Sequence, residues 1–126
     1  MIPAPSERRA HPRESLGVRV ALHIAGGPAV LPALLENISL GGCYFATPVA
    51  AVSEGAAVSL SFSMRPSGLC AASGHVVRCR VGHGFGVQFQ TINEGLRELV
   101  GTLTCTDEDG RAEVAAAITA PDVQIR

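Results

Sequence analysis

Runs in which apolar and polar residues alternate make up most of the chain after its first fifteen residues. In the clearest run, residues 58–64, Val, Leu, Phe and Met occupy every second position and serines lie between them. A period of two is typical of a strand with one face in the core. Two more runs, residues 75–81 and 85–90, flank Gly82-His83-Gly84 and predict a β-hairpin with a glycine-rich turn. Similar runs predict strands over residues 18–24, 30–36 and 43–47.

The alternation also assigns side chains to the faces of these strands. In the first strand of the predicted hairpin, we expect Val77, Cys79 and Val81 to share one face, because they occupy every second position. Pro32 has no backbone N–H to donate to a neighbouring strand. The strand that contains Pro32 is therefore expected at a sheet edge or at a bulge.

The period changes after the last predicted strand. Apolar residues follow the spacing i, i+3, i+4, i+7 at Leu96, Leu99, Val100 and Leu103, which indicates an amphipathic helix. Thr91, with a glutamate three residues later, predicts a capping box at the start of this helix. Five or six short strands and one late helix indicate a mainly β domain, an antiparallel barrel or sandwich closed by a helix.

The composition fits one globular domain. The chain has 126 residues, of which 47% are hydrophobic and 17% charged. We expect residues 1–15 to form a flexible arm, residues 16–104 the folded domain, and residues 105–126 a tail that is a short helix or disordered. The first fifteen residues lack the apolar core of a signal peptide, and prolines, glycines and charges interrupt the most apolar stretch, residues 18–35. The sequence therefore predicts a cytoplasmic protein with no membrane insertion.

Charge and cysteine content exclude several kinds of chemistry. The net charge is −1, and all ten basic residues are arginines. Without lysine there is no P-loop lysine and no Schiff base, whereas arginine offers a planar fork that suits phosphates and guanine edges. The four cysteines form no C-x-x-C pair, so we expect neither a zinc site nor another cofactor, and we interpret them as small buried apolar residues.

Two short motifs have no evident role in a core. The first is the basic stretch Arg8-Arg9-Ala10-His11-Pro12-Arg13, and the second is Asn37-Ile38-Ser39-Leu40-Gly41-Gly42, which lies between two predicted strands. Taken alone, the first is typical of a solvated basic tail. The second is typical of a turn in which asparagine and serine cap the backbone and glycines adopt positive φ.

The two motifs together resemble the PilZ family of cyclic di-GMP receptors. The ligand motifs of that family are R-x-x-x-R followed by D/N-x-S-x-x-G. Arg9 and Arg13 match the first, and Asn37, Ser39 and Gly42 match the second. The residues around 84–89 and the helix after them also look like the closing elements of the family, so the resemblance covers residues 7–104. It implies a six-stranded antiparallel barrel with one C-terminal helix, which binds the ligand, catalyses nothing and signals through a protein effector.

The residues in these motifs suit the two phosphates and two guanines of cyclic di-GMP. Arginine binds phosphate through charge-assisted hydrogen bonds and also pairs with guanine O6 and N7. The Asn37 amide and the Ser39 hydroxyl can pair with a guanine edge. Gly41 and Gly42 have no Cβ and so permit a close approach to the backbone.

Arg8 adds one guanidinium beside the R-x-x-x-R motif. Cyclic di-GMP can associate into an intercalated dimer, and members of the family with two adjacent arginines here look inclined to hold that dimer. Arg8 is therefore predicted to contact a second ligand molecule by stacking and bidentate hydrogen bonding. The alternative is that Arg8 is a solvated charge.

Three other functions were weighed against this one. An enzyme is disfavoured, because Ser39 is not in a G-x-S-x-G elbow and the G-x-G at Gly84 lacks the third glycine of a dinucleotide fingerprint. A protein-interaction module that keeps the barrel but has lost the ligand stays open, although the intact motifs argue against it. A nucleic-acid binder is disfavoured by the net charge and by the scarcity of aromatic residues, at 4%.

Overall fold

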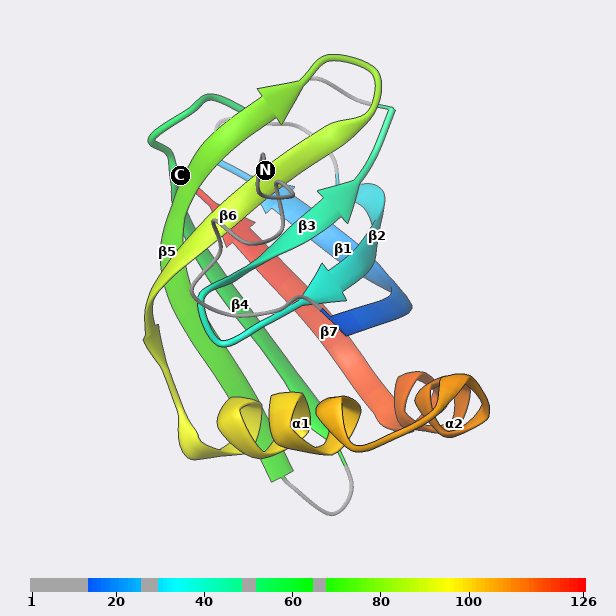
Figure 1. Cartoon of the computed structure of the whole chain (residues 1–126). Helices are drawn as coiled ribbons and strands as arrows, with labels where there is room; N and C mark the ends of the chain where they lie inside the picture. Colours follow the sequence, from blue (N-terminus) through cyan, green and yellow to red (C-terminus); the bar gives the residue numbers. More distant parts are fainter. Residues whose placement is uncertain (1–13, 26–29, 49–51, 65–67) are drawn as a thin grey trace, which may run out of the picture.

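The computed structural model of the chain describes residues 14–25, 30–48, 52–64 and 68–126. Within these residues, seven strands form a barrel and two helices lie at one end of it (Figure 1). The strands are β1 (Glu14–Ile24), β2 (Val30–Ile38), β3 (Gly42–Ala46), β4 (Ala57–Met64), β5 (Gly68–Arg80), β6 (Gly84–Ile92) and β7 (Ile118–Ile125), and the helices are α1 (Glu94–Thr104) and α2 (Glu108–Ala117).

The barrel is closed, so each strand pairs with a neighbour on both sides. The strand order is β1-β2-β3-β6-β5-β4-β7, and β7 returns to β1. Neighbours are antiparallel except β1 and β7, which run parallel. The predicted mainly β barrel is confirmed. The predicted count of six strands and one helix was wrong, because the described residues contain a seventh strand and a second helix.

The C-terminal segment supplies the additional strand and helix. It was predicted to be a tail, but β7 fills the gap between β4 and β1 and so completes the barrel. Its alternation is weak in the sequence, because Pro121 interrupts the run before the fully buried Val123. The register with β4 shifts between Ser61 and Ser63, opposite Pro121. A bulge of this kind accommodates a proline, which has no N–H for the ladder.

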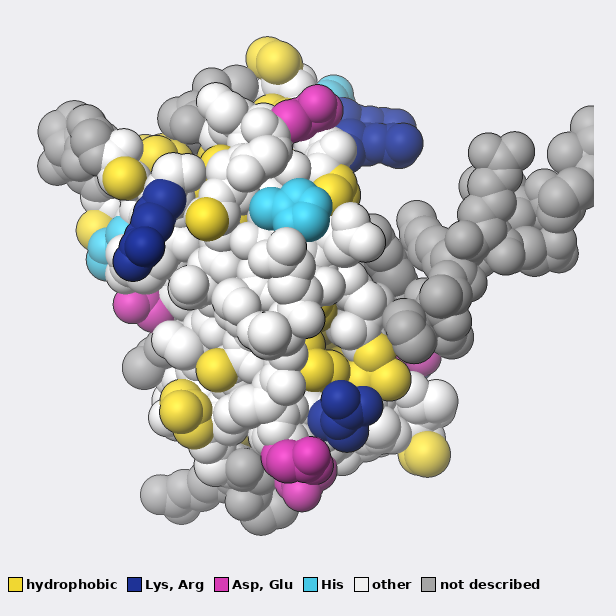
Figure 2. Space-filling view, turned by 90° about the vertical axis from the view of Figure 1, so that its left-hand side faces the viewer, with side chains coloured by type: hydrophobic (Ala, Val, Ile, Leu, Met, Phe, Trp, Pro, Cys, Tyr) yellow, Lys and Arg dark blue, Asp and Glu magenta, His cyan; other side chains and the backbone are white. Residues whose placement is uncertain are grey.

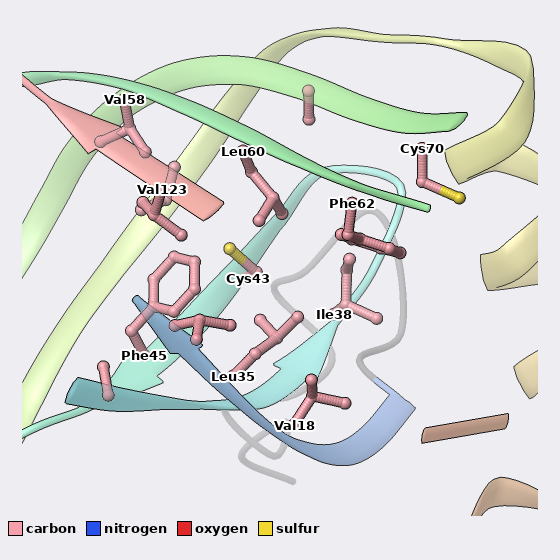
Figure 3. Close-up of a cluster of buried hydrophobic side chains, with 14 of the residues drawn as sticks. Val18, Leu35, Ile38, Cys43, Phe45, Val58, Leu60, Phe62, Cys70 and Val123 are labelled. Carbon is pink, nitrogen blue, oxygen red and sulfur yellow. The ribbon is translucent and has the colours of Figure 1, made fainter. Parts of the chain in front are cut away.

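Side chains from all seven strands fill the barrel interior. Figure 3 shows part of this core, in which Leu35 and Phe45 from one side face Leu60 and Phe62 from the other. The rings of Phe45 and Phe85 lie 5.3 Å apart between centroids at an interplanar angle of 34°. Tilted aromatic pairs at such distances add a specific attraction to the burial of apolar area.

The cysteines divide between the core and the surface. Cys43 and Cys70 are fully buried, as predicted for small apolar residues, but Cys79 is partly buried and Cys105 is exposed. Burial raises the pKa of the Cys70 thiol above its usual value, and the nearby charge of Glu98 raises it further. The Cys70 thiol is therefore held in its neutral form, which suits an apolar site.

A bulge in β5 changes the predicted face assignment. Val76 pairs with Val87 and Arg78 pairs with Gly86, so Val77 is an extra residue on β5. Val76 is buried, whereas the side chain of Val77 is on the outside. The prediction that Val77, Cys79 and Val81 share one face was wrong, because the bulge interrupts the alternation and Val81 lies in the turn after the strand.

Helix α1 covers the end of the barrel that lies lowest in Figure 1. Its buried face contains the predicted Leu96, Leu99, Val100 and Leu103. Its N-cap is Asn93 rather than the predicted Thr91. The Asn93 Oδ1 accepts hydrogen bonds from the backbone N–H of Leu96 and of Ala71, and Nδ2 donates to the Leu69 carbonyl. One side chain therefore both caps the helix and fixes it to β5.

Strand β2 shows how a proline fits into a closed barrel. Pro32 pairs with Ala21 of β1, whereas the pairing of β2 with β3 begins only at Leu34. At Pro32, β2 is therefore paired with β1 but not with β3. This agrees with the predicted edge position, because proline has no N–H to donate to a second strand.

The face of the barrel shown in Figure 2 carries few charged side chains, and they are of both signs. Arginine side chains lie beside acidic ones near the top and the bottom of this view, and white polar side chains and backbone cover most of the area. Neither helix in the described part of the chain is long and apolar enough to cross a membrane.

Candidate ligand-binding site

The N-x-S-x-x-G motif forms a tight turn between β2 and β3. The Ser39 N–H donates to the Gly42 carbonyl at 2.8 Å. The Ser39 Oγ accepts from the N–H groups of Gly41 and Gly42, each at 3.1 Å, and donates to the Gly42 carbonyl at 3.2 Å. Because the Ser39 side chain is buried and bonded on every side to the turn, it shapes the loop from within.

Both glycines of the loop lie against β6, and packing between strands requires a glycine at position 42. The carbonyl of Gly41 accepts a hydrogen bond from the N–H of Phe89 on β6. A Cβ on Gly42 would lie 2.2 Å from the carbonyl oxygen of Val87, which is too close for any side chain. Neither glycine is among the described glycines with positive φ. The expectation of positive φ in this turn was therefore wrong, and close approach of β6 is the physical reason for glycine at position 42.

Asn37 begins a row of residues that crosses four strands on the outside of the barrel. Asn37 of β2 pairs with Tyr44 of β3, Tyr44 pairs with Gly86 of β6, and Gly86 pairs with Arg78 of β5. Asn37 and Tyr44 are half-buried, whereas Arg78 is exposed. The register thus brings an amide, an aromatic ring and a guanidinium to one surface, although they come from distant parts of the chain.

This row forms the floor of a groove of about 840 Å³. Small-molecule sites have volumes of about 300–1,000 Å³. Nine described residues line it, namely Glu36, Asn37, Tyr44, Ala46, Val77, Arg78, Arg80, His83 and Gly86. Gly86 has no side chain, so there is open space above it in the groove floor. A Cβ at this position would lie 3.9 Å from Tyr44 and 4.0 Å from Val77, which are ordinary contact distances.

Positive charge predominates along the groove wall contributed by β5. Arg78 and Arg80 are two residues apart and both line the groove, opposite the single acidic residue Glu36. The ion pairs within the described residues are His23–Asp122 and Arg111–Glu14, so neither groove arginine belongs to one. Two guanidinium groups in a groove with an aromatic wall suit a planar anionic ligand.

Arg8, Arg9 and Arg13 of the basic stretch lie outside the described residues. The first described residues after them, Glu14 and Ser15, pair with Ile38 and Asn37 of β2. The arm therefore joins the barrel directly beside the loop motif.

Sequence reasoning missed the groove residues outside the two motifs. Tyr44, Arg78, Arg80 and His83 all line the groove, but the sequence analysis assigned them no ligand role. One available signal was the R-x-R spacing of Arg78 and Arg80, which puts two arginines on the same face of a strand. The bulge at Val77 puts Arg78 and Arg80 on the outer face of the barrel. No sequence pattern predicted this bulge.

The structure is a small closed barrel with a groove on its outer face. Within the described residues, no group of three or more metal-ligating side chains is present. The family model for the PilZ domain matches residues 7–104, and the chain therefore belongs to the PilZ family, whose members are cyclic di-GMP receptors and act as binding modules. Comparison with curated proteins and with solved structures found no match.

Proposed function

We propose that this chain binds cyclic di-GMP in the groove over β2, β3, β5 and β6 and acts as a signalling adaptor. The observation that carries the proposal is the position of Asn37. It belongs to the family motif, pairs with the residue where the arm joins the barrel, and lines the groove that contains Arg78 and Arg80. The loop motif therefore adjoins the groove, and the chain that follows the basic stretch enters the barrel beside it.

Each part of the site has a distinct chemical role in this proposal. Arg9 and Arg13 of the arm, together with Arg78 and Arg80, bind phosphates or guanine edges through bidentate hydrogen bonds. The Asn37 amide reads a guanine edge, and the half-buried ring of Tyr44 offers an apolar surface for a base. Ser39, Gly41 and Gly42 hold the turn that presents Asn37.

The alternative is a PilZ-like interaction module that does not bind the nucleotide. The groove favours the receptor, because a module that had lost its ligand would have no need of two arginines beside an intact motif. In either case the output depends on a protein effector, since a binding domain transmits a signal only by changing what it contacts.

Calorimetric titration with cyclic di-GMP tests the proposal, with cyclic di-AMP and GTP as specificity controls. The decisive variant is Gly86→Val, which adds methyl groups to the floor of the groove. A Cβ at Gly86 makes only ordinary contacts, so the barrel should fold normally. The matched control is Gly101→Val on the exposed side of α1, where a Cβ would meet nothing within 4 Å.

We expect the wild type and Gly101→Val to bind cyclic di-GMP equally, and Gly86→Val to lose about tenfold or more in affinity with an unchanged melting temperature. Arg13→Ala should weaken binding by about tenfold to a hundredfold, because a hydrogen bond to a charged group contributes about 1.5–3 kcal/mol. Absence of heat with the wild type would favour the interaction module. Full affinity in Gly86→Val would place the ligand elsewhere.

A further inference from the structure

A buried ion pair lies where the basic arm joins the barrel. Glu14, the first residue of β1, has a side chain that is only 12% exposed, and its Oε2 lies 2.5 Å from Nη2 of Arg111. Its second oxygen accepts a hydrogen bond from the Thr104 hydroxyl at 3.4 Å. A carboxylate removed from water in this way needs such partners to offset its desolvation.

Arg111 connects three parts of the fold. It lies on α2, and its guanidinium donates to the carbonyl groups of Leu103 and Thr106 at the C-terminal end of α1, both at 3.3 Å. The Leu103 carbonyl also accepts a hydrogen bond from the Thr106 N–H at 3.3 Å, so the guanidinium is an additional, charged donor there. Its positive charge complements the helix dipole at the C-terminal end of α1. The same side chain reaches Glu14 on β1, 97 residues away in the sequence.

Helix α2 packs against the barrel core through residues that are only partly buried, namely Val114, Ala115 and Ala117. None of its residues is buried, whereas five residues of α1 are. Figure 1 shows α2 beside α1 at the end of the barrel, near the start of β1. In addition to this apolar packing, the structure describes a polar contact between α2 and β1, the pair of Arg111 and Glu14.

The beginning of β1 is partly separated from the rest of the strand. Its pairing with β2 shifts between Ser15 and Val18, and Gly17 has a φ of 101°. Among the described residues, Glu14 and Ser15 continue the ladder beyond this bulge, and Ser15 lies opposite Asn37 of the groove. So short a segment needs an anchor of its own, because two paired residues offset little of the entropy lost on ordering.

We propose that Glu14 and Arg111 are positioning residues that hold the start of the arm against Asn37, so that the arm arginines meet the groove. Arg13 precedes Glu14 directly, and fixing the backbone at Glu14 limits where Arg13 can reach. The C-terminal helix α2 is then part of the ligand-binding apparatus, although it does not line the groove. The ligand part of this inference rests on the proposed function, whereas the anchoring part does not.

Two measurements on the variant Arg111→Met test the two parts separately. Amide hydrogen exchange at residues 14–17 reports whether the start of β1 is held, with Leu22 of the same strand as an internal reference. Calorimetric titration with cyclic di-GMP reports the consequence for the site. We expect exchange at residues 14–17 to become about tenfold faster with Leu22 unchanged, and affinity to fall by about tenfold, within the range typical of coupling between sites.

Two further variants separate positioning from general stability. Glu14→Gln keeps the shape of the side chain and removes its charge. It should show the same changes as Arg111→Met, and it replaces that variant if Arg111→Met does not fold. Arg111→Lys keeps the positive charge and should recover part of both the slow exchange and the affinity. The matched control is Asp122→Asn. Asp122 of β7 pairs with His23 of β1, and 2.5 Å separates the His23 Nε2 from the Asp122 Oδ1. This substitution therefore removes a different charged contact of β1, and it should leave both the exchange at residues 14–17 and the affinity unchanged.

Each outcome decides one part of the inference. Unchanged exchange at residues 14–17 in both Arg111→Met and Glu14→Gln would overturn the anchor, whatever the ligand does. Faster exchange with full affinity for cyclic di-GMP would overturn the link to binding. If the wild type itself did not bind cyclic di-GMP, the proposed function would fail and the ligand part with it, and exchange alone would decide the anchor.

Discussion

Ser39 and Asn37, two residues apart in the loop motif, have different surroundings. The Ser39 side chain is 3% exposed and bonded to the backbone of its own turn. Asn37 is half-buried and lines the groove. The sequence suggested a guanine contact for both. The hydrogen bonds of Ser39 assign it to shaping the turn, and the guanine contact of Asn37 stays a prediction.

Substitution of these two residues should therefore have different effects. Ser39→Ala leaves the buried N–H of Gly42 without its partner and should lower the free energy of unfolding by about 1–3 kcal/mol, measured by denaturant titration. Asn37→Ala should leave stability nearly unchanged and reduce the preference for cyclic di-GMP over cyclic di-AMP, measured by calorimetry. If Asn37→Ala weakened both dinucleotides equally, Asn37 would not read the base.

Individual residues show why part of the site could be predicted from the sequence. Asn37, Ser39 and Gly42 were identified because the motif is local and its spacing is fixed. Tyr44 and Arg78 were not identified, because they approach Asn37 only through pairings of β2, β3, β6 and β5. Such a row depends on register, and a single bulge changes which side chains belong to it.

Strand β7 is the element on which closure of the barrel depends. It pairs with β4 on one side and with β1 on the other, and it contributes the fully buried Val123 and the nearly buried Ile125 to the core. Without it, β1 and β4 would each expose an unpaired edge. The C-terminal strand is thus as central to the barrel as the strands that the sequence predicted.

The substitution Val123→Ala should destabilise the domain strongly. It removes two methyl groups from a closed core, and we expect the free energy of unfolding to fall by about 2–3 kcal/mol in denaturant titration. The neighbouring Gln124 is exposed, so Gln124→Ala should change stability by less than about 0.5 kcal/mol. Equal effects of the two substitutions would mean that β7 does not close the barrel in solution.

At the level of elements, strong alternation was predictive and interrupted alternation was not. The run at 58–64 corresponds to β4 and the helical spacing at 96–103 to α1, because no proline or bulge disturbs either pattern. β7 contains Pro121, and β5 contains the bulge beside Val77, and both departed from the prediction. Tertiary pairing decides such segments, since their local pattern is compatible with several structures.

The whole molecule has little net charge with which to attract an anionic ligand. Its net charge is −1, and the face in Figure 2 carries arginine and acidic side chains side by side. Attraction to phosphates therefore has to come from local clusters, namely the arm arginines and the pair Arg78 and Arg80. In the proposed site, each phosphate of the ligand can then contact more than one arginine.

The number of ligands bound per chain follows from this count of arginines. The family motif uses Arg9 and Arg13, and Arg8 adds a guanidinium that can stack on or pair with an exposed guanine of a second ligand in an intercalated dimer. We therefore expect about two molecules of cyclic di-GMP per chain at saturation in calorimetric titration. Arg8→Ala should lower this toward one and leave the first binding event nearly unchanged.

Arg97→Ala, which removes an exposed arginine from α1 instead, is the matched control and should still take two ligands. The comparison isolates the position of the charge, because both variants lose one arginine and have the same net charge. Saturation of the wild type at one ligand, or two ligands on Arg8→Ala, would show that Arg8 is only a solvated charge. Loss of the second ligand in both variants would instead assign it to general electrostatic attraction, which screening by added salt would then abolish.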